Sequence, residues 1–240
     1  MFDKMDFYRD SEEQLLTMEI DKNDKIMAAT AFHVGDGILV TAKHNVDHDG
    51  TFKLIDKNGK EFQHSQKFLA PGKTDIAVLK TNFQSPGATV SMYTLPTKTE
   101  PASLIHERRP SKFIKLNSKL NRAQLMKAYL LEDVYLFGFP PVPMTVSNHL
   151  ISVKAQVNSI VLSSQSDWPL LVISSVPRGG FSGGPVMDQD GSLIGICIEA
   201  LYEQSEPSFS GFTAAICIEP LLNLMKENDL RPEGNSEFLN

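Results

Sequence analysis

The chain contains a serine in a setting that suits acyl-transfer chemistry. Ser182 lies in the stretch RGGFSGGPV, residues 178–186, with two glycines shortly before it and two directly after it. Glycine loses more backbone entropy on folding than any other residue, so such a cluster indicates a conformation that side chains would block. A serine hydroxyl becomes a useful nucleophile only when a base removes its proton. Ser182 therefore requires a histidine as base and a buried carboxylate that orients this histidine.

His44 is the histidine best placed to be this base. It follows the β-branched segment GILVTAK, residues 37–43, which predicts a strand that ends there and leaves the imidazole at the edge of a lobe. Asp75 directly precedes the apolar run 76–79, and an acid at the mouth of a buried strand can reach a neighbouring edge. Taken singly, each residue has an ordinary structural explanation, as a surface or hydrogen-bonded histidine and as a strand-start aspartate. The other histidines are His33, His48, His64, His106 and His149.

Composition and spacing exclude several classes of protein. The 240 residues, 41% hydrophobic and 22% charged, are typical of a soluble globular protein with a sizeable core. The formal net charge of -6 gives no reason to expect nucleic-acid binding. No run of about 18 apolar residues is present, which excludes a membrane-spanning helix. His44 and His48 form an H-x-x-x-H pair without a following glutamate or an evident third ligand, so we predict no metal and no cofactor.

The cysteines and the first residues bear on the compartment. Cys197 and Cys217 are the only cysteines, so a dense disulfide framework is impossible and a reducing compartment is favoured. The first twenty residues are rich in charged side chains and leave no room for the apolar core of a signal peptide. We therefore expect a cytoplasmic protein in which both thiols are free and buried.

Short β-rich apolar segments alternate with turn residues along most of the chain, which predicts two β lobes of similar size. A helix with Pro220 in its first turn is expected after the last strand. The predicted strands cover residues 25–33, 38–41, 51–55 and 76–79 in the first half, and 134–137, 151–162, 170–175, 192–199 and 209–218 in the second half.

The segment between the lobes, residues 97–131, has a different character. Leu120, Met126 and Leu130 belong to a three-to-four spacing that predicts a short helix over residues 118–130. From residue 98 to residue 127 there are eight Lys or Arg against two Glu, a local charge of +6. This segment is either a docking strip for an acidic protein partner or a solvated linker helix, and the limited number of aromatic residues favours the linker.

Three segments resemble the signature segments of the chymotrypsin-fold, or trypsin-like, serine proteases. They are TAKHNV around His44, TDIAVLK around Asp75 and GGFSGGPV around Ser182, in the His, Asp, Ser order of that family. Other segments are similar to strands of its bacterial high-temperature-requirement branch, namely VYLFGFP at 134–140, DGSLIGICIEA at 190–200 and GFTAAI at 211–216.

The resemblance implies an all-β fold of two six-stranded barrels with the active site in the cleft between them. A helical insertion would separate the barrels, and a helix would follow the second one. The expected units are 1–96, an N-terminal barrel with a leader; 97–131, a basic, partly helical linker; 132–218, a C-terminal barrel; and 219–240, a C-terminal helix and tail.

The resemblance also implies roles for single residues. Ser182 would be the nucleophile, His44 the general base and later acid, and Asp75 the group that fixes the tautomer of His44. The backbone amides of Gly180 and Ser182 would form the oxyanion hole. The two glycines after the serine would let the strand and the substrate backbone pass close to the nucleophile.

One position departs from the pattern of the digestive members. Those proteases place an aspartate directly before the nucleophile, where it pairs with a newly cut N-terminal amine. Phe181 occupies this position and cannot form an ion pair. We therefore predict that no zymogen cleavage occurs and that packing or a partner orders the site.

The specificity pocket follows from the same resemblance. Its base would be Val176, six residues before the nucleophile, and a buried valine offers no counter-charge, so we expect an aliphatic side chain at the cleavage position. Glu199 would reverse this preference if it points inward, and strand alternation leaves the register open. Arg178 would stand near the rim of the cleft. The predicted pocket residues are Val176, Pro177, Ile198, Glu199, Ala200, Gly211, Phe212 and Thr213.

The function that fits these observations is a serine endopeptidase that cleaves protein or peptide substrates through an acyl-enzyme. One alternative is a partner-activated or catalytically silent trypsin-like scaffold or binding module. Another is an esterase that uses the same site. Hydrolysis of a generic protein such as casein by the isolated chain discriminates between the enzyme and the scaffold, and cleavage of activated esters without peptide cleavage would indicate the esterase.

Overall fold

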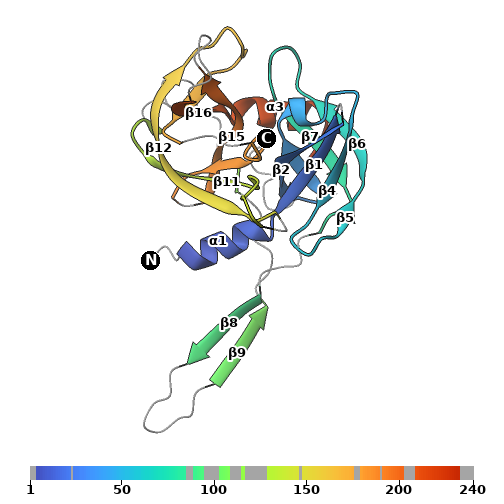
Figure 1. The fold of residues 1–240 in the computed structure, drawn as a ribbon, viewed down its shortest axis with the longest axis vertical. Helices are drawn as coiled ribbons and strands as arrows, with labels where there is room; N and C mark the ends of the chain where they lie inside the picture. Colours follow the sequence, from blue (N-terminus) through green and yellow to red (C-terminus); the bar gives the residue numbers. More distant parts are fainter. Residues whose placement is uncertain are drawn as a thin grey trace.

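The described residues form two large β-sheets, one from each half of the sequence, and a separate two-stranded hairpin, in a computed structural model (Figure 1). In Figure 1 the N-terminal sheet is coloured blue to cyan, and the C-terminal sheet lies beside it in yellow to red. The structure describes residues 4–22, 24–84, 89–94, 103–108, 115–116, 129–145, 148–175, 179–189, 191–202 and 209–232.

The N-terminal sheet has seven antiparallel strands and is curled but open. Its strands are β1 (Leu15–Lys22), β2 (Lys25–Gly35), β3 (Ile38–Thr41), β4 (Thr51–Ile55), β5 (Glu61–Phe62), β6 (His64–Leu69) and β7 (Ala77–Thr81). They pair in the order β5-β4-β1-β2-β3-β7-β6, and no pairing joins β5 to β6 within the described residues. This curled half-barrel corresponds to the first of the two six-stranded barrels that we expected. Strands β5 and β6, separated by Gln63 alone, pair with β4 and β7 at opposite edges of the sheet, so one bent segment of the chain connects these edges.

The C-terminal sheet confirms the predicted six-stranded barrel. Its strands are β11 (Asp133–Gly138), β12 (Ile151–Val161), β13 (Leu170–Ile173), β14 (Pro185–Met187), β15 (Ser192–Tyr202) and β16 (Phe209–Cys217). They pair in the order β15-β14-β11-β12-β13-β16, and an additional pairing of β15 with β16 closes the barrel. A short strand, β10 (Lys115–Leu116), adds to β15 in parallel.

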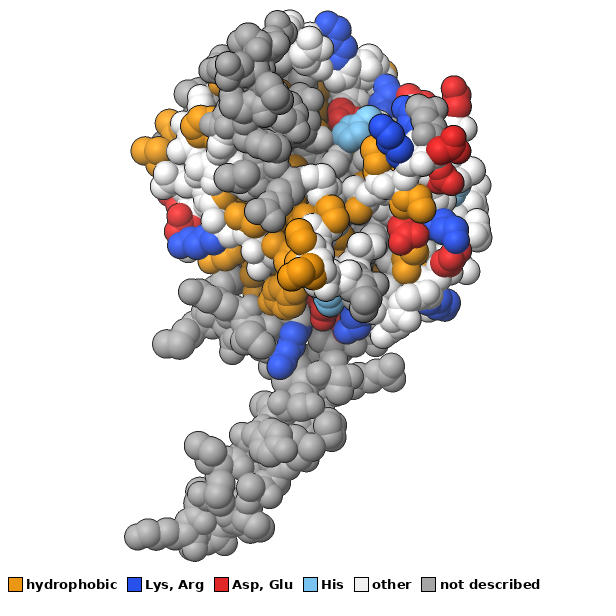
Figure 2. All heavy atoms as spheres, viewed as in Figure 1, with side chains coloured by type: hydrophobic (Ala, Val, Ile, Leu, Met, Phe, Trp, Pro, Cys, Tyr) orange, Lys and Arg blue, Asp and Glu red, His pale blue; other side chains and the backbone are white. Residues whose placement is uncertain are grey.

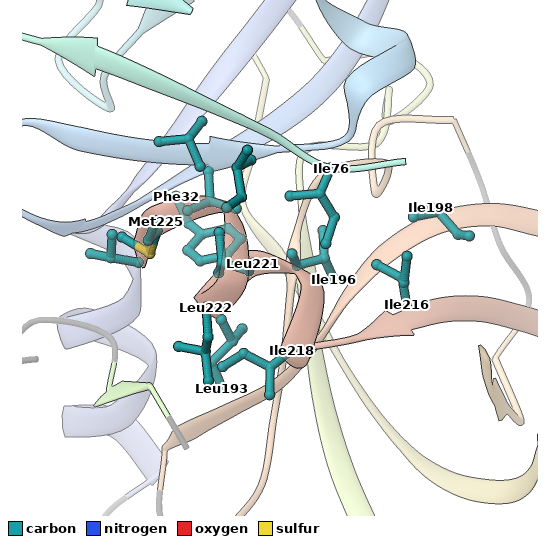
Figure 3. Packing of buried hydrophobic residues seen from close by; sticks show 14 of the residues in the cluster. Phe32, Ile76, Leu193, Ile196, Ile198, Ile216, Ile218, Leu221, Leu222 and Met225 are labelled. Carbon is teal, nitrogen blue, oxygen red and sulfur yellow. The ribbon is translucent and has the colours of Figure 1, made fainter. Parts of the chain in front are cut away.

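One apolar core joins the two sheets (Figure 3). Phe32 and Ile76 enter it from the N-terminal sheet, and Ile196 and Ile216 enter from the barrel, with all four side chains fully buried. Helix α3 (Glu219–Glu227) covers this core with Leu221 and confirms the helix expected after the last strand. Each such side chain contributes about 1.5–3 kcal/mol when it leaves water. The core therefore fixes how the two sheets face each other.

A helix that we did not expect precedes the first strand. Helix α1 (Lys4–Glu12) packs against the C-terminal barrel, where the Phe7 ring meets the rings of Tyr135 and Phe137 edge-on at 5.4 Å. The Tyr8 hydroxyl donates to the Leu150 carbonyl at 2.8 Å. We expected only a leader ahead of residue 25, because the charged side chains of this region obscure its apolar positions. The chain therefore contacts the barrel before it enters the N-terminal sheet.

Part of the segment between the sheets is a β-hairpin. Strand β8 (Thr89–Thr94) pairs with β9 (Ser103–Arg108), and Figure 1 shows this hairpin apart from the two sheets. The helix expected over residues 118–130 lies mostly outside the described residues, and the side chains of the basic residues 98–127 are not described. Alternating apolar residues such as Val90 and Met92 favour strands in the described hairpin, whereas Tyr129, near the end of the expected helix, is helical. No helix in the described part of the chain is long and apolar enough to cross a bilayer.

Candidate active site

Neighbouring elements of the N-terminal sheet place His44 and Asp75. The short 3-10 helix η1 (Lys43–Asn45) carries His44 and directly follows β3. Asp75 lies in the loop between β6 and β7. The Lys43 ammonium donates to the carbonyl oxygen of Ala70 in this loop at 3.0 Å. This contact holds the loop against η1, so that the carboxylate and the imidazole face each other.

His44, Asp75 and Ser182 form a continuous hydrogen-bonded chain. His44 Nδ1 lies 2.7 Å from Asp75 Oδ2, and the backbone amide of His44 donates to Asp75 Oδ1 at 2.9 Å. Ser182 Oγ lies 2.7 Å from His44 Nε2. A carboxylate can only accept, so Nδ1 carries the proton and Nε2 is free to accept from the serine hydroxyl. The side chains of His44 and Asp75 are 50% and 27% exposed, which leaves the arrangement accessible from solvent.

The serine hydroxyl has two other acceptors at longer range. The Ile198 carbonyl lies 3.3 Å from Ser182 Oγ, and Asn45 Oδ1 lies at 3.5 Å. The bond to His44 Nε2 is the shortest of the three and is therefore favoured. The Asn45 amide nitrogen donates to the Ser182 carbonyl at 3.2 Å and to Thr41 Oγ1 at 3.0 Å. The backbone of the serine is thus tied to the end of β3.

The glycines around Ser182 permit contacts that side chains would prevent. Gly180 has φ +102°, and a Cβ on it would lie 2.3 Å from the carbonyl oxygen of Phe139. Gly183 has φ +83°, and a Cβ there would lie 2.2 Å from Thr41 Oγ1. Both positions combine a left-handed backbone with close neighbours, which only glycine accommodates. These constraints explain why the sequence places glycines at this turn.

Two backbone amides of the turn have no acceptor among the described residues. The Phe181 carbonyl accepts from the Gly184 amide at 2.9 Å. Because the N–H and C=O of a trans peptide point in opposite directions, this bond directs the Ser182 amide away from the interior of the turn. In the part of the chain that the structure describes, neither the Ser182 nor the Gly180 amide donates a hydrogen bond. Phe181 itself packs into the barrel core.

The predicted pocket residues are described only in part. Val176 and Pro177, together with Arg178 at the expected rim, lie outside the described residues. Ile198 is buried, with its carbonyl oxygen close to Ser182 as given above. Glu199 and Ala200 lie in β15, where they pair with Ala214 and Thr213 of β16, and their side chains are not described. In β16, Gly211 has φ +76°, Phe212 is 38% exposed, and Thr213 is buried with its hydroxyl donating to Ser175 O at 3.2 Å.

Two buried polar residues next to the site were not singled out from the sequence. Thr30 lies in the middle of β2, and its amide donates to the Ser182 carbonyl at 2.9 Å. Asn45 follows His44 directly and is 2% exposed. Thr30 interrupts the apolar stretch AATAF. A polar residue there indicates a specific hydrogen bond if the strand is buried on both faces. The sequence alone does not show that both faces are covered.

Among the described residues no group of three or more His, Cys, Asp or Glu could hold a metal ion. Burial raises the pKa of the Cys197 thiol to about 12, so this neighbour of the serine turn stays protonated. Figure 2 shows charges of both signs over the N-terminal sheet and hydrophobic side chains gathered near the middle of this face.

The fold and the sequence both match known peptidases. Residues 29–196 match the model of the trypsin-like peptidase domain, so the chain belongs to this family. No curated protein matches the sequence. Neither the family match nor the structural similarity assigns the chain to the bacterial high-temperature-requirement branch, which stays a prediction.

Solved structures of the Rv3671c protease from M. tuberculosis are similar to this chain. Its active form has a TM-score of 0.63 at 14% identity, over 95% of this chain and 86% of the other. Its inactive form has a TM-score of 0.59 at 14% identity, over 92% of both chains. At this identity the similarity establishes a common chymotrypsin-like fold.

Proposed function

We propose that this protein is a serine endopeptidase in which Ser182 attacks the peptide carbonyl. The observation that carries the proposal is the chain of hydrogen bonds from Asp75 through His44 to Ser182 Oγ, both side-chain links being 2.7 Å long. A base within hydrogen-bond reach of the proton that it removes is the first geometric requirement of such catalysis. Membership of the trypsin-like peptidase family supports peptides and proteins as substrates.

In the first half-reaction the serine is acylated. The bond between Ser182 Oγ and the carbonyl carbon forms while the hydroxyl proton passes to His44 Nε2. Asp75 stabilises the resulting imidazolium through Nδ1–H. The tetrahedral intermediate collapses when His44 gives this proton to the leaving nitrogen and the C–N bond breaks. An acyl-enzyme and a free amine result.

In the second half-reaction water releases the acyl group. His44 Nε2 takes a proton from water as its oxygen attacks the ester carbonyl, and returns that proton to Ser182 Oγ when the C–O bond breaks. The amides of Gly180 and Ser182 would stabilise the negative oxygen in both steps. Their lack of protein acceptors within the described residues supports this role.

The remaining sequence-based expectations are kept as proposals. We propose an aliphatic preference at the cleavage position, no zymogen cleavage, and a cytoplasmic location, which two buried free cysteines support. An acidic protein partner on the basic segment 98–127 is a further proposal. The partner-activated or silent scaffold is the less favoured function, because one chain already brings the three side chains together.

A fluorophosphonate probe tests the proposal directly. The folded wild-type protein should be labelled on one serine, and Ser182→Ala should abolish labelling. His44→Ala should reduce it strongly, while Ser65→Ala and His64→Ala serve as matched controls on β6 and should label normally. Casein hydrolysis by the isolated chain should follow the same pattern. A folded wild-type protein that neither takes the probe nor cleaves casein would refute the endopeptidase.

A further inference from the structure

Thr30 makes a side-chain contact between the two lobes that the proposed catalytic steps do not use. It lies in the middle of β2 and is fully buried. Its hydroxyl donates to the carbonyl oxygen of Gly180 at 2.6 Å, although 150 residues separate the two in sequence. The amide of Phe139 donates to Thr30 Oγ1 and to the same carbonyl, at 3.2 Å each. Thr30 thus links the N-terminal sheet to the turn that precedes Ser182.

The hydroxyl is a specific feature in an apolar part of the strand. Ala29, Ala31 and Phe32 around it are buried, and a valine would match the volume of threonine without a polar atom. A buried hydroxyl destabilises the fold unless it finds a partner. Thr17 lies directly opposite Thr30 on β1 and is also buried. Thr17 makes no hydrogen bond through its side chain in the described part of the chain, but it lines a surface pocket and its hydroxyl is not sealed from solvent as that of Thr30 is.

The backbone of Thr30 extends the same contact to Ser182. Its amide donates to the Ser182 carbonyl at 2.9 Å, and its carbonyl accepts from Thr41 Oγ1 at 2.8 Å. The same carbonyl oxygen lies 2.3 Å from the place of a Cβ on Gly183. One residue therefore holds the carbonyls of both residues whose amides would form the oxyanion hole.

Gly180 needs such an external constraint. Glycine rotates about its two backbone bonds without the steric limits that a Cβ imposes, and Gly180 already lies at φ +102°. The bond from Thr30 fixes the orientation of the peptide group that follows Gly180. With that group fixed, fewer orientations are open to the peptide group that precedes Gly180. That preceding peptide carries the Gly180 amide. Without the hydroxyl, the Phe139 amide would be the remaining donor to the Gly180 carbonyl.

We propose that the Thr30 hydroxyl is the positioning group that holds the oxyanion turn in its productive conformation. The proposal rests on the proposed function. Thr30 does not touch the substrate and acts through the direction of the Gly180 amide. The lobe that supplies the histidine would thereby also order the oxyanion hole on the other lobe.

Three variants test this proposal by steady-state hydrolysis of a peptide ester and a peptide amide. Thr30→Val removes the hydroxyl and keeps the volume, and should lower kcat about 10- to 100-fold, less than the ~10²–10³ that loss of a whole oxyanion donor costs. KM should change much less than kcat. Thr30→Ser keeps the hydroxyl and should recover most of kcat. Thr17→Val is the matched control and should keep wild-type kcat.

A second measurement separates positioning from stability. Inhibition by a peptide boronic acid, which forms a tetrahedral adduct, should weaken in Thr30→Val in parallel with kcat/KM. The melting temperatures of Thr30→Val and Thr17→Val control for loss of fold. A Thr30→Val variant with wild-type kcat would overturn the proposal, and so would a loss that Thr30→Ser fails to rescue in a folded protein. If the wild-type protein takes no probe and cleaves no substrate, the proposed function fails and this inference falls with it.

Discussion

Acidification should destabilise the protein through one buried histidine, His33 in β2. Its side chain is 2% exposed, and burial lowers its pKa from 6.5 to about 4. Nδ1 lies 3.1 Å from Gln14 Oε1, and the Gly37 amide donates to Nε2 at 3.1 Å. The neutral ring with its proton on Nδ1 satisfies both bonds. A second proton on Nε2 would break the bond from Gly37 and leave a charge among apolar neighbours such as Phe83.

The size and sign of the effect follow from the two pKa values. Because the pKa is lower in the folded state, the unfolded chain binds the proton more readily, and stability falls as the pH drops. The contribution of neutral His33 to the free energy of unfolding is fully present above pH 6.5, the pKa of the unfolded state. It is lost progressively as the pH approaches 4. A difference of about 2.5 units at 1.36 kcal/mol each gives about 3 kcal/mol. This is a large part of the 5–15 kcal/mol that typically stabilises a domain.

Urea unfolding between pH 7 and pH 4 measures this effect in wild type and in His33→Gln. The substitution removes the titrating group, so the variant should lose about 3 kcal/mol less than wild type over this range. Carboxylates titrate equally in both proteins and cancel in the comparison. His64→Gln changes an exposed histidine and should behave like wild type. Equal pH slopes for wild type and His33→Gln would show that the buried ring does not control acid stability.

Three further outcomes are expected. Asp75→Asn should lower kcat about 10⁴-fold, because the asparagine amide would donate to Nδ1 of His44 and force the ring proton onto Nε2. A loss below tenfold in hydrolysis assays would contradict the assigned tautomer. Gly183→Ala should destabilise the fold in thermal unfolding, because its Cβ would lie 2.2 Å from Thr41 Oγ1, whereas Gly179→Ala, with nothing within 4 Å, should not. The Cys197 thiol, with a pKa of about 12, should resist a thiol reagent in the native protein and react after denaturation.

The sequence predicted the parts of the molecule that depend on short motifs and local alternation. The segment Ile38–Thr41 was expected as a strand and is β3, and Ser182 was expected at a glycine turn. His44 and Asp75 lie in segments that are recognisable from the sequence, each next to a strand, and the structure brings both to this serine. Such features need only neighbours in the sequence to be recognised.

Other parts depend on contacts that no local pattern contains. Thr30 resembles any β-branched residue in a strand, and its role becomes visible only with its partner 150 residues away. The helix over Lys4–Glu12 was missed because its stability comes from the packing of its Phe7 side chain against the distant barrel, which no local sequence pattern shows.

The core around Phe32 and Ile76 also has a consequence for unfolding. Its side chains come from both lobes and from α3, so neither lobe can lose its structure without exposing apolar surface of the other. The lobes should therefore melt as one cooperative unit, in a single calorimetric transition. Halves produced separately by division between residues 85 and 131 would each lack part of their interior, and they should recover structure only when mixed.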